Sequence, residues 1–317
     1  MLTLFSGTGL GLFDINLRQY ENSTPIKSGN NSSFPTDSLA LNLARGNLIL
    51  QQADQNVFGL GGSSQLLRTY NSQGQTDDSF RFSFEKRLRL EGAVNAVGSR
   101  LLRQSGDGFE QVFIFDESTG IYRSAQGEGA DDTITYDDST ASWRYLEGTS
   151  RQREEYNEAG QLQRWIDKAG QAIEVRYNAA GNVSEIEDAS GQITQFNYNG
   201  NLLQSVATIS AGDTHTRLYY HYDNLQRLSA VLVDESPEDN DIADGAVYKT
   251  EYLYDGDSNR VSEVITPQGS RLSISYQAIT LPSGETQWRV SELSDGNGND
   301  TRIVYDLEQR STSVFYR

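Results

Sequence analysis

The sequence predicts an all-β fold, built from stacked β-hairpins that form a curved open sheet or part of a hollow β-shell. Three observations support this prediction. Apolar and polar residues alternate with period two in runs such as FRFSFE at 80–85, which is typical of half-buried strands. No segment sustains a long apolar stripe with helical spacing. From residue 156 a unit of about 20 residues recurs, which indicates a supersecondary unit stacked on its neighbours.

The composition narrows the class of protein. The chain has 317 residues, a formal net charge of −18 and no cysteine, which excludes disulfides, thiolate nucleophiles and cysteine metal sites. A surface this acidic repels phosphates and anionic membranes, so nucleic acid and membrane are not expected partners. No apolar run approaches the roughly 18 residues of a membrane span. The N-terminus has no basic region before its apolar residues, and we do not interpret it as a secretory signal.

Changes in composition divide the chain into three segments. Residues 1–36 are an expected leader or linker, because Ser, Asn, Pro and Gly dominate from residue 20 onwards. Residues 37–150 are β-rich, with short apolar runs and frequent turns. Residues 151–317 are expected to form the array of repeats.

Each repeat is long enough for a β-hairpin with two turns. Its tyrosines are Tyr156, Tyr177, Tyr198, Tyr222, Tyr254, Tyr276 and Tyr305. In the first two units glycines follow at Gly160 and Gly170, then at Gly181 and Gly191. We predict that each tyrosine packs on a neighbouring unit and that its hydroxyl finds a partner there. The Asn or Asp after it should cap a turn, with the glycines at positive φ. A hairpin cannot bury its apolar face alone, so this pattern is structural rather than catalytic.

The repeats resemble those of a known family. YNEAGQLQRWIDKAGQ, YNAAGNVSEIEDASGQ, YDNLQRLSAV and YDLEQR are similar to YD repeats, the units of Rhs proteins, toxin-complex B and C components and teneurins. Asn often stands where the typical unit has Asp, and Gln where it has Arg. Upstream, Arg45-Gly46-Asn47 and Arg68-Thr69-Tyr70-Asn71-Ser72 resemble the leading segment of Rhs-type cores. The resemblance therefore covers about residues 37–317.

The resemblance implies a long sheet of hairpins that winds into a hollow shell. In the bacterial members this shell encloses a toxin domain carried at the C-terminus of the same chain, and in teneurins it belongs to a cell-adhesion ectodomain. The Asp-Pro-x-Gly type self-cleavage segment that usually ends an Rhs core does not occur here. We therefore expect this sequence to be the N-terminal part of a longer repeat region. A strand ending at 315–317 leaves an open sheet edge, through which we expect the isolated chain to associate.

Few residues suggest chemistry. His215 and His221 follow no nucleophile motif, and we expect both to be structural. Residues 295–306 place Asp295, Asn297, Asn299 and Asp306 at positions one, three, five and twelve of a candidate calcium loop. Position six is not glycine and the flanks are not helical, so we favour a pair of repeat turns. The stretch 255–266 begins in the same way and departs from the calcium loop at positions six and twelve, which are Arg260 and Thr266.

Two further features have a structural and a functional interpretation. The run DESPEDNDIADG at 234–245 is expected to be a solvated loop between strands, and the alternative is a contact for a basic partner or a cation. Trp143, Trp165 and Trp288 could be stacking platforms for sugars, but core packing is the favoured interpretation. No phosphate- or dinucleotide-binding fingerprint is present.

The sequence therefore favours a structural module of a bacterial Rhs/YD-repeat protein, part of a β-shell that houses a C-terminal toxin. The alternative is a cell-surface binding module that recognises a glycan or a protein. No enzymatic activity and no cofactor are expected. The expected partners are the remainder of the shell and a toxin cargo in the same polypeptide. The expected location is outside the bacterium or on its surface.

Overall fold

The computed structural model describes residues 2–6, 9–12, 38–57, 64–74, 80–125 and 129–317. Most of the expected leader at 1–36 therefore lies outside the described residues. Within them, nearly all regular structure is β, and the one helical element is the 3₁₀ turn η1 (Ile242–Asp244). The prediction of an all-β fold is confirmed.

Five strands form a small inner sheet, and their order in the sheet follows the chain. They are β1 (Leu2–Phe5), β2 (Ser38–Asn42), β3 (Asn47–Val57), β4 (Ser64–Asn71) and β5 (Phe80–Phe82). Strand β1 runs parallel to β2, and the other neighbours are antiparallel.

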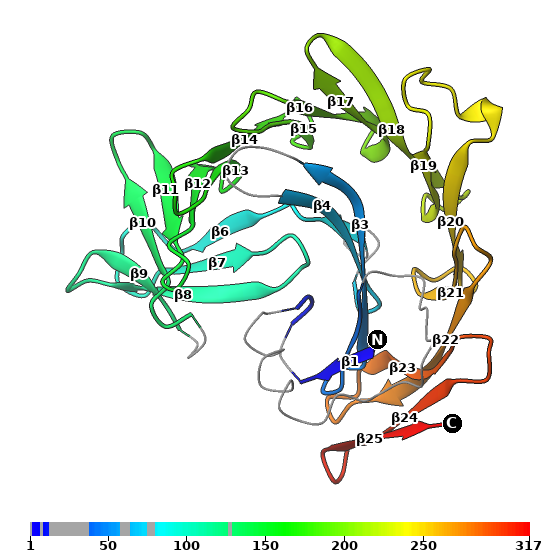
Figure 1. Cartoon of the computed structure of the whole chain (residues 1–317). Helices are drawn as coiled ribbons and strands as arrows, with labels where there is room; N and C mark the ends of the chain where they lie inside the picture. The colour runs from blue at the N-terminus through cyan, green and yellow to red at the C-terminus, as the bar shows by residue number, and fades with distance from the viewer. Residues whose placement is uncertain (1, 7–8, 13–37, 58–63, 75–79, 126–128) are drawn as a thin grey trace.

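The next 20 strands form one long antiparallel meander. They are β6 (Arg87–Glu91), β7 (Arg100–Gln104), β8 (Glu110–Asp116), β9 (Ile121–Ser124), β10 (Thr133–Asp137), β11 (Ser142–Leu146), β12 (Arg153–Asn157), β13 (Leu162–Ile166), β14 (Ala172–Tyr177), β15 (Val183–Glu187), β16 (Ile193–Asn199), β17 (Leu202–Ser210), β18 (Asp213–Tyr222), β19 (Leu228–Asp234), β20 (Val247–Tyr254), β21 (Val261–Ile265), β22 (Arg271–Thr280), β23 (Thr286–Ser294), β24 (Asp300–Asp306) and β25 (Ser311–Tyr316). Figure 1 shows this outer sheet curving around β3 and β4 of the inner sheet.

The outer sheet is open. In the described part of the chain β25 pairs with β24 alone, and β6 pairs with β7, so no register joins the two ends. The expected curved open sheet is therefore present. The division between the two sheets falls between Phe82 and Arg87, well before the first repeat tyrosine, Tyr156.

One apolar core lies between the inner sheet and the concave face of the outer sheet. Leu39, Leu41 and Tyr70 of the inner sheet share this core with Tyr220 and Val261 of the outer sheet, and all five are at most 1 % exposed. The alternation of β2 explains the arrangement, because Ala40 faces the other way and packs with Phe5 and Ile49 in a second, smaller cluster. The space inside this part of the curve is thus occupied by the chain's own first strands.

The first strand of the outer sheet returns to a later turn. The Leu88 backbone N–H donates to the Gly160 carbonyl at 2.8 Å, and Arg87 bridges to Gln161. Gly160 has φ +77°, and a Cβ there would lie 1.9 Å from the Leu88 oxygen. A glycine is therefore required at 160 both for its backbone conformation and for the close approach of β6.

Candidate functional site

Each repeat tyrosine from Tyr156 to Tyr276 marks a β-bulge. Tyr177 pairs with Val183 while the preceding residue, Arg176, pairs with Glu185, so Ser184 is the extra residue. The same shift occurs at the other tyrosines, and the residue before the bulge is apolar each time. The pairs are Tyr156–Leu162, Tyr177–Val183, Tyr198–Leu203, Tyr222–Leu228, Tyr254–Val261 and Tyr276–Val290. A bulge interrupts the ladder of backbone hydrogen bonds, and it also explains why Val183 and Ile186 are both buried despite opposite parity.

The hydroxyl of the next tyrosine binds the apolar residue that precedes the bulge. Tyr177 donates to the carbonyl of Leu162 at 2.9 Å, and Tyr276 donates to that of Val261 at 2.8 Å. The full set, which we call the tyrosine ladder, also includes Tyr222 to Leu203, Tyr254 to Leu228 and Tyr305 to Val290. Burial raises the pKa of Tyr177 to about 12, so its hydroxyl remains a donor at neutral pH. The ladder thus ties five of the seven repeat tyrosines to the unit before them, as the sequence predicted for their hydroxyl groups.

The turns between strands also have the predicted chemistry. Asn178 Oδ1 accepts the backbone N–H groups of Ala180 and Asn182, each at 3.0 Å. All four predicted glycines, Gly160, Gly170, Gly181 and Gly191, have positive φ. In the YDNLQR unit the same position is held by Gln226 with φ 61°, which is a strained conformation for a residue with a Cβ.

The motif that resembles the Rhs leading segment joins the two sheets. Arg68 on β4 binds Asp54 with two hydrogen bonds, of 2.9 and 2.8 Å, and donates to the Tyr252 hydroxyl at 2.6 Å. Tyr220 donates to the same carboxylate at 2.9 Å. The Tyr70 hydroxyl accepts the Val261 N–H at 2.8 Å. These hydrogen bonds cross the seam between the inner and the outer sheet. Because their partners are buried, they fix how the two sheets are aligned, in addition to the apolar core that lies between them.

A second buried ion cluster holds the first strands of the outer sheet. Glu154, 2 % exposed, accepts two hydrogen bonds of 2.7 Å from Arg103 and one of 2.6 Å from Lys86. Burial alone would raise the pKa of Glu154, but the positive charges of Arg103 and Lys86 lower it well below its usual range. Sequence reasoning did not identify this acid. Glu154 stands two residues before Tyr156 on β12, so the two side chains lie on the same face of the strand. This spacing could have indicated that Glu154 points inward.

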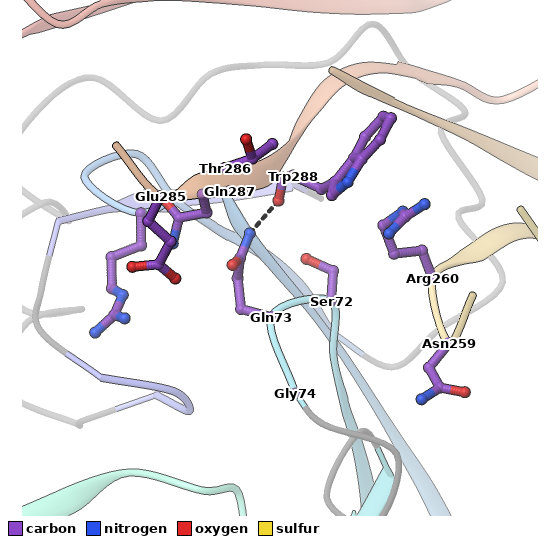
Figure 2. Close-up of a pocket in the computed structure, with 10 residues that line it drawn as sticks. Ser72, Gln73, Gly74, Asn259, Arg260, Glu285, Thr286, Gln287 and Trp288 are labelled. Carbon is purple, nitrogen blue, oxygen red and sulfur yellow. Dashed lines mark hydrogen bonds between the residues drawn. The ribbon is translucent and has the colours of Figure 1, made fainter. Parts of the chain in front are cut away.

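A cleft of about 360 Å³ opens at the seam between the two sheets. The inner sheet contributes Arg45 and residues 72–74, and the outer sheet contributes residues 259–260 and 285–288. Figure 2 shows the Gln73 amide donating to the carbonyl of Trp288. The Arg260 guanidinium lies 4.3 Å from the Trp288 ring centroid and pairs with Asp255 at 2.8 Å. No sequence pattern predicts this cleft, because its walls come from segments far apart in the chain.

The candidate calcium residues do not converge. Asp295 precedes β24 and caps its own turn, accepting the N–H groups of Asn297 at 2.8 Å and Asn299 at 3.3 Å. Asp306 ends β24 and accepts the N–H of Gln309 at 2.8 Å. A strand of this length separates the two carboxylates by about 20 Å. Across the described ranges, no three His, Asp or Glu residues are grouped so that they could hold a metal ion.

The remaining candidates are also separated from one another. His215 and His221 lie six residues apart on one strand, β18, a rise of about 20 Å. Trp143 is 2 % exposed and packs on Tyr122, whereas Trp288 is 41 % exposed.

The acidic run 234–245 connects β19 to β20, and Asn240 fastens it to the preceding hairpin by accepting the Thr216 N–H at 2.7 Å. No helix in the described part of the chain is long and apolar enough to cross a membrane.

These features define a β-hairpin repeat protein whose units are coupled by tyrosines. The family model RHS Repeat matches residues 156–193, which contain the first tyrosine-to-carbonyl contact of the ladder. Over these residues the predicted resemblance to Rhs/YD repeats is confirmed. A search of the curated proteins finds no match.

Solved structures show similarity at low identity. The crystal structure of TcdB2-TccC3-TEV is 16 % identical, with a TM-score of 0.31, over 88 % of this chain and 15 % of that chain. TcdB2-TccC3 without its hypervariable C-terminal region has 16 % identity and a TM-score of 0.32 over the same shares. The Photorhabdus luminescens Tc holotoxin pore has 15 % identity and a TM-score of 0.26, over 84 % of this chain and 18 % of that chain. The chain thus spans less than a fifth of the length of these structures.

Proposed function

We propose that this chain is a wall segment of a bacterial Rhs-type shell that encloses a toxin carried at the C-terminus of the same polypeptide. The observation that carries the proposal is the tyrosine ladder, in which the tyrosine of one hairpin satisfies a carbonyl of the hairpin before it. Contacts of this kind allow hairpins to be added to the sheet one after another, and they have no evident use in catalysis.

In this proposal the module itself performs no chemistry. The histidines lie about 20 Å apart on one strand, and the buried carboxylates of Asp54 and Glu154 are already bound by arginines. Its role is to hold an enclosed domain away from solvent and proteases. The location that fits this role is outside the producing bacterium or on its surface.

Limited proteolysis of the longer gene product tests the proposal. We expect the segment downstream of residue 317 to resist proteinase K while the shell is folded, and to be cut quickly when that segment is produced alone. Equal cleavage rates in the two forms would overturn encapsulation, as would a gene that codes for no further domain. Tight binding of the intact chain to a surface glycan or receptor would instead support the alternative of a binding module.

A further inference from the structure

One buried arginine of the outer sheet has no carboxylate partner among the residues that the structure describes. The described residues include three buried arginines: Arg68, Arg103 and Arg289. Asp54 binds Arg68 and Glu154 binds Arg103, each in a close ion pair. Arg289 on β23 is 7 % exposed, yet its partners are the amide oxygen of Gln287 at 2.9 Å and the ring of Tyr305 at 5.1 Å. A buried guanidinium usually has an anionic partner, so Arg289 is an exception that requires an explanation.

A second arginine is held beside it. Arg45 lies in the turn between β2 and β3, and among the described residues it forms no ion pair. The backbone fixes this turn against β23, because the Val290 N–H donates to the Gly46 carbonyl at 3.3 Å. A Cβ at Gly46 would lie 2.5 Å from the Arg289 Cβ, so the two segments are in direct contact.

The two positive charges oppose each other. Burial lowers the pKa of Arg289; Tyr305 opposes this effect, and the nearby charge of Arg45 adds a smaller lowering of the pKa. In a chain with a net charge of −18, carboxylates are abundant, but none lies within 4.0 Å of either guanidinium in the described part of the chain. An anion bound here would relieve the repulsion and supply the missing partner.

The cleft at the seam provides the space for such an anion. Arg45 and Gln287 both line it, together with the hydroxyl-bearing residues Ser72 and Thr286. Arg260 is already paired with Asp255, and the one carboxylate in the wall, that of Glu285, belongs to an exposed residue. Two positive charges at or near the cleft therefore have no carboxylate partner among the described residues. One is that of Arg45, which lines the cleft, and the other is that of Arg289, which is hydrogen-bonded to the lining residue Gln287.

We propose that this cleft binds a small anionic group, a carboxylate or a phosphate ester, with Arg45 as its direct cationic partner and Arg289, which is hydrogen-bonded to the lining residue Gln287, adding its charge from behind. The ligand would sit between the β2–β3 turn and β23, and so would hold the inner sheet to the outer one. This site is separate from the tyrosine ladder and goes beyond the wall-building role.

Urea unfolding of the intact chain tests the proposal, with sodium phosphate and sodium succinate as probes and sodium chloride at matched ionic strength as reference. We expect at least one probe to raise the unfolding midpoint above that in chloride, because a ligand that binds the folded state stabilises it. The anion that acts identifies the source, phosphate or carboxylate. Arg45→Ala should weaken the apparent affinity by about tenfold or more.

The matched control is Arg302→Ala, which removes the same charge from an exposed arginine of β24 that forms no ion pair with another described residue. It should leave the response to the anion unchanged. Arg289→Gln should weaken the response by less than Arg45→Ala does, and if that variant does not fold, Arg45→Ala alone decides. The proposal is overturned if neither probe exceeds chloride, or if Arg302→Ala reduces the response as much as Arg45→Ala.

Discussion

Replacing Gly160 by alanine should destabilise this chain far more than the same replacement at Gly170. Both glycines have positive φ, +77° and +87°, so each alanine carries about 1–2 kcal/mol of backbone strain. At Gly170 nothing lies within 4 Å of the new methyl group. At Gly160 the methyl group would lie 1.9 Å from the backbone oxygen of Leu88, and a backbone atom cannot move aside as a flexible side chain can.

The additional loss of stability in Gly160→Ala can be estimated from the contacts that must break. Strand β6 would have to leave the turn, which breaks the 2.8 Å hydrogen bond between the Leu88 N–H and the Gly160 carbonyl and also the bridge from Arg87 to Gln161. Two lost backbone interactions amount to about 1–3 kcal/mol. Partial exposure of Leu88, now 5 % exposed, adds about 1 kcal/mol. Gly160→Ala should therefore exceed Gly170→Ala by about 2–4 kcal/mol.

Equilibrium unfolding in urea, followed by circular dichroism, measures both variants. Amide hydrogen exchange supplies a local readout, since the Leu88 amide should lose protection in Gly160→Ala and keep it in Gly170→Ala. Equal destabilisation of the two variants, with the Leu88 amide still protected, would refute the close approach of β6 to this turn.

Three further predictions concern single contacts and the sheet edge. Gln226→Gly should stabilise the chain by about 1 kcal/mol in urea unfolding, because glycine removes the strain of φ 61°; a loss of stability would contradict this. Glu154→Gln should cost about 3–5 kcal/mol at pH 7, since it leaves Arg103 buried without its anion. The folded-state pKa of Glu154 lies below the unfolded value, so its contribution is present above the unfolded pKa and is lost as pH falls through the folded one. The gap between wild type and variant should narrow in acid, and a gap independent of pH would contradict the ion pair. Strand β25 leaves an unpaired edge in the described part of the chain, and Phe315 on it is 54 % exposed. Light scattering should therefore show association that increases with salt, because salt screens the repulsion between chains of net charge −18. A monodisperse monomer at both low and high salt would mean that this edge is covered.

The local features of the repeats could be predicted from the sequence. Tyr177, Asn178 and Gly181 act within a few residues of one another, and their spacing alone indicates a capped turn with a glycine at positive φ. The alternation of apolar and polar residues in AIEVRY at 172–177 also indicates that Ile173 and Val175 share one face of β14, and both are buried. These properties depend on short-range sterics and hydrogen bonding, which a single sequence encodes directly.

The contacts between the sheets could not be predicted in the same way. Arg68 meets Tyr252 across 184 positions of the chain, and period-two patterning gives the face of a residue but not its partner. The bulge residues show the same limit, because an apolar residue followed by Ser or Gln is too common to be read as a bulge. Likewise, composition could not distinguish Trp143, which is buried, from Trp288, which borders the cleft.

Removing single hydroxyl groups from the tyrosine ladder tests directly whether these hydroxyls couple neighbouring repeats. Tyr177→Phe and Tyr254→Phe keep the packed ring but remove the donor to the Leu162 and Leu228 carbonyls. Tyr316→Phe is the control, since Tyr316 is 46 % exposed. In urea unfolding, each ladder variant should lose about 1–2 kcal/mol, because a partly buried carbonyl at a bulge loses its partner, and the control should lose almost nothing. Ladder variants as stable as the control would contradict the claim that these hydroxyls couple one repeat to the next.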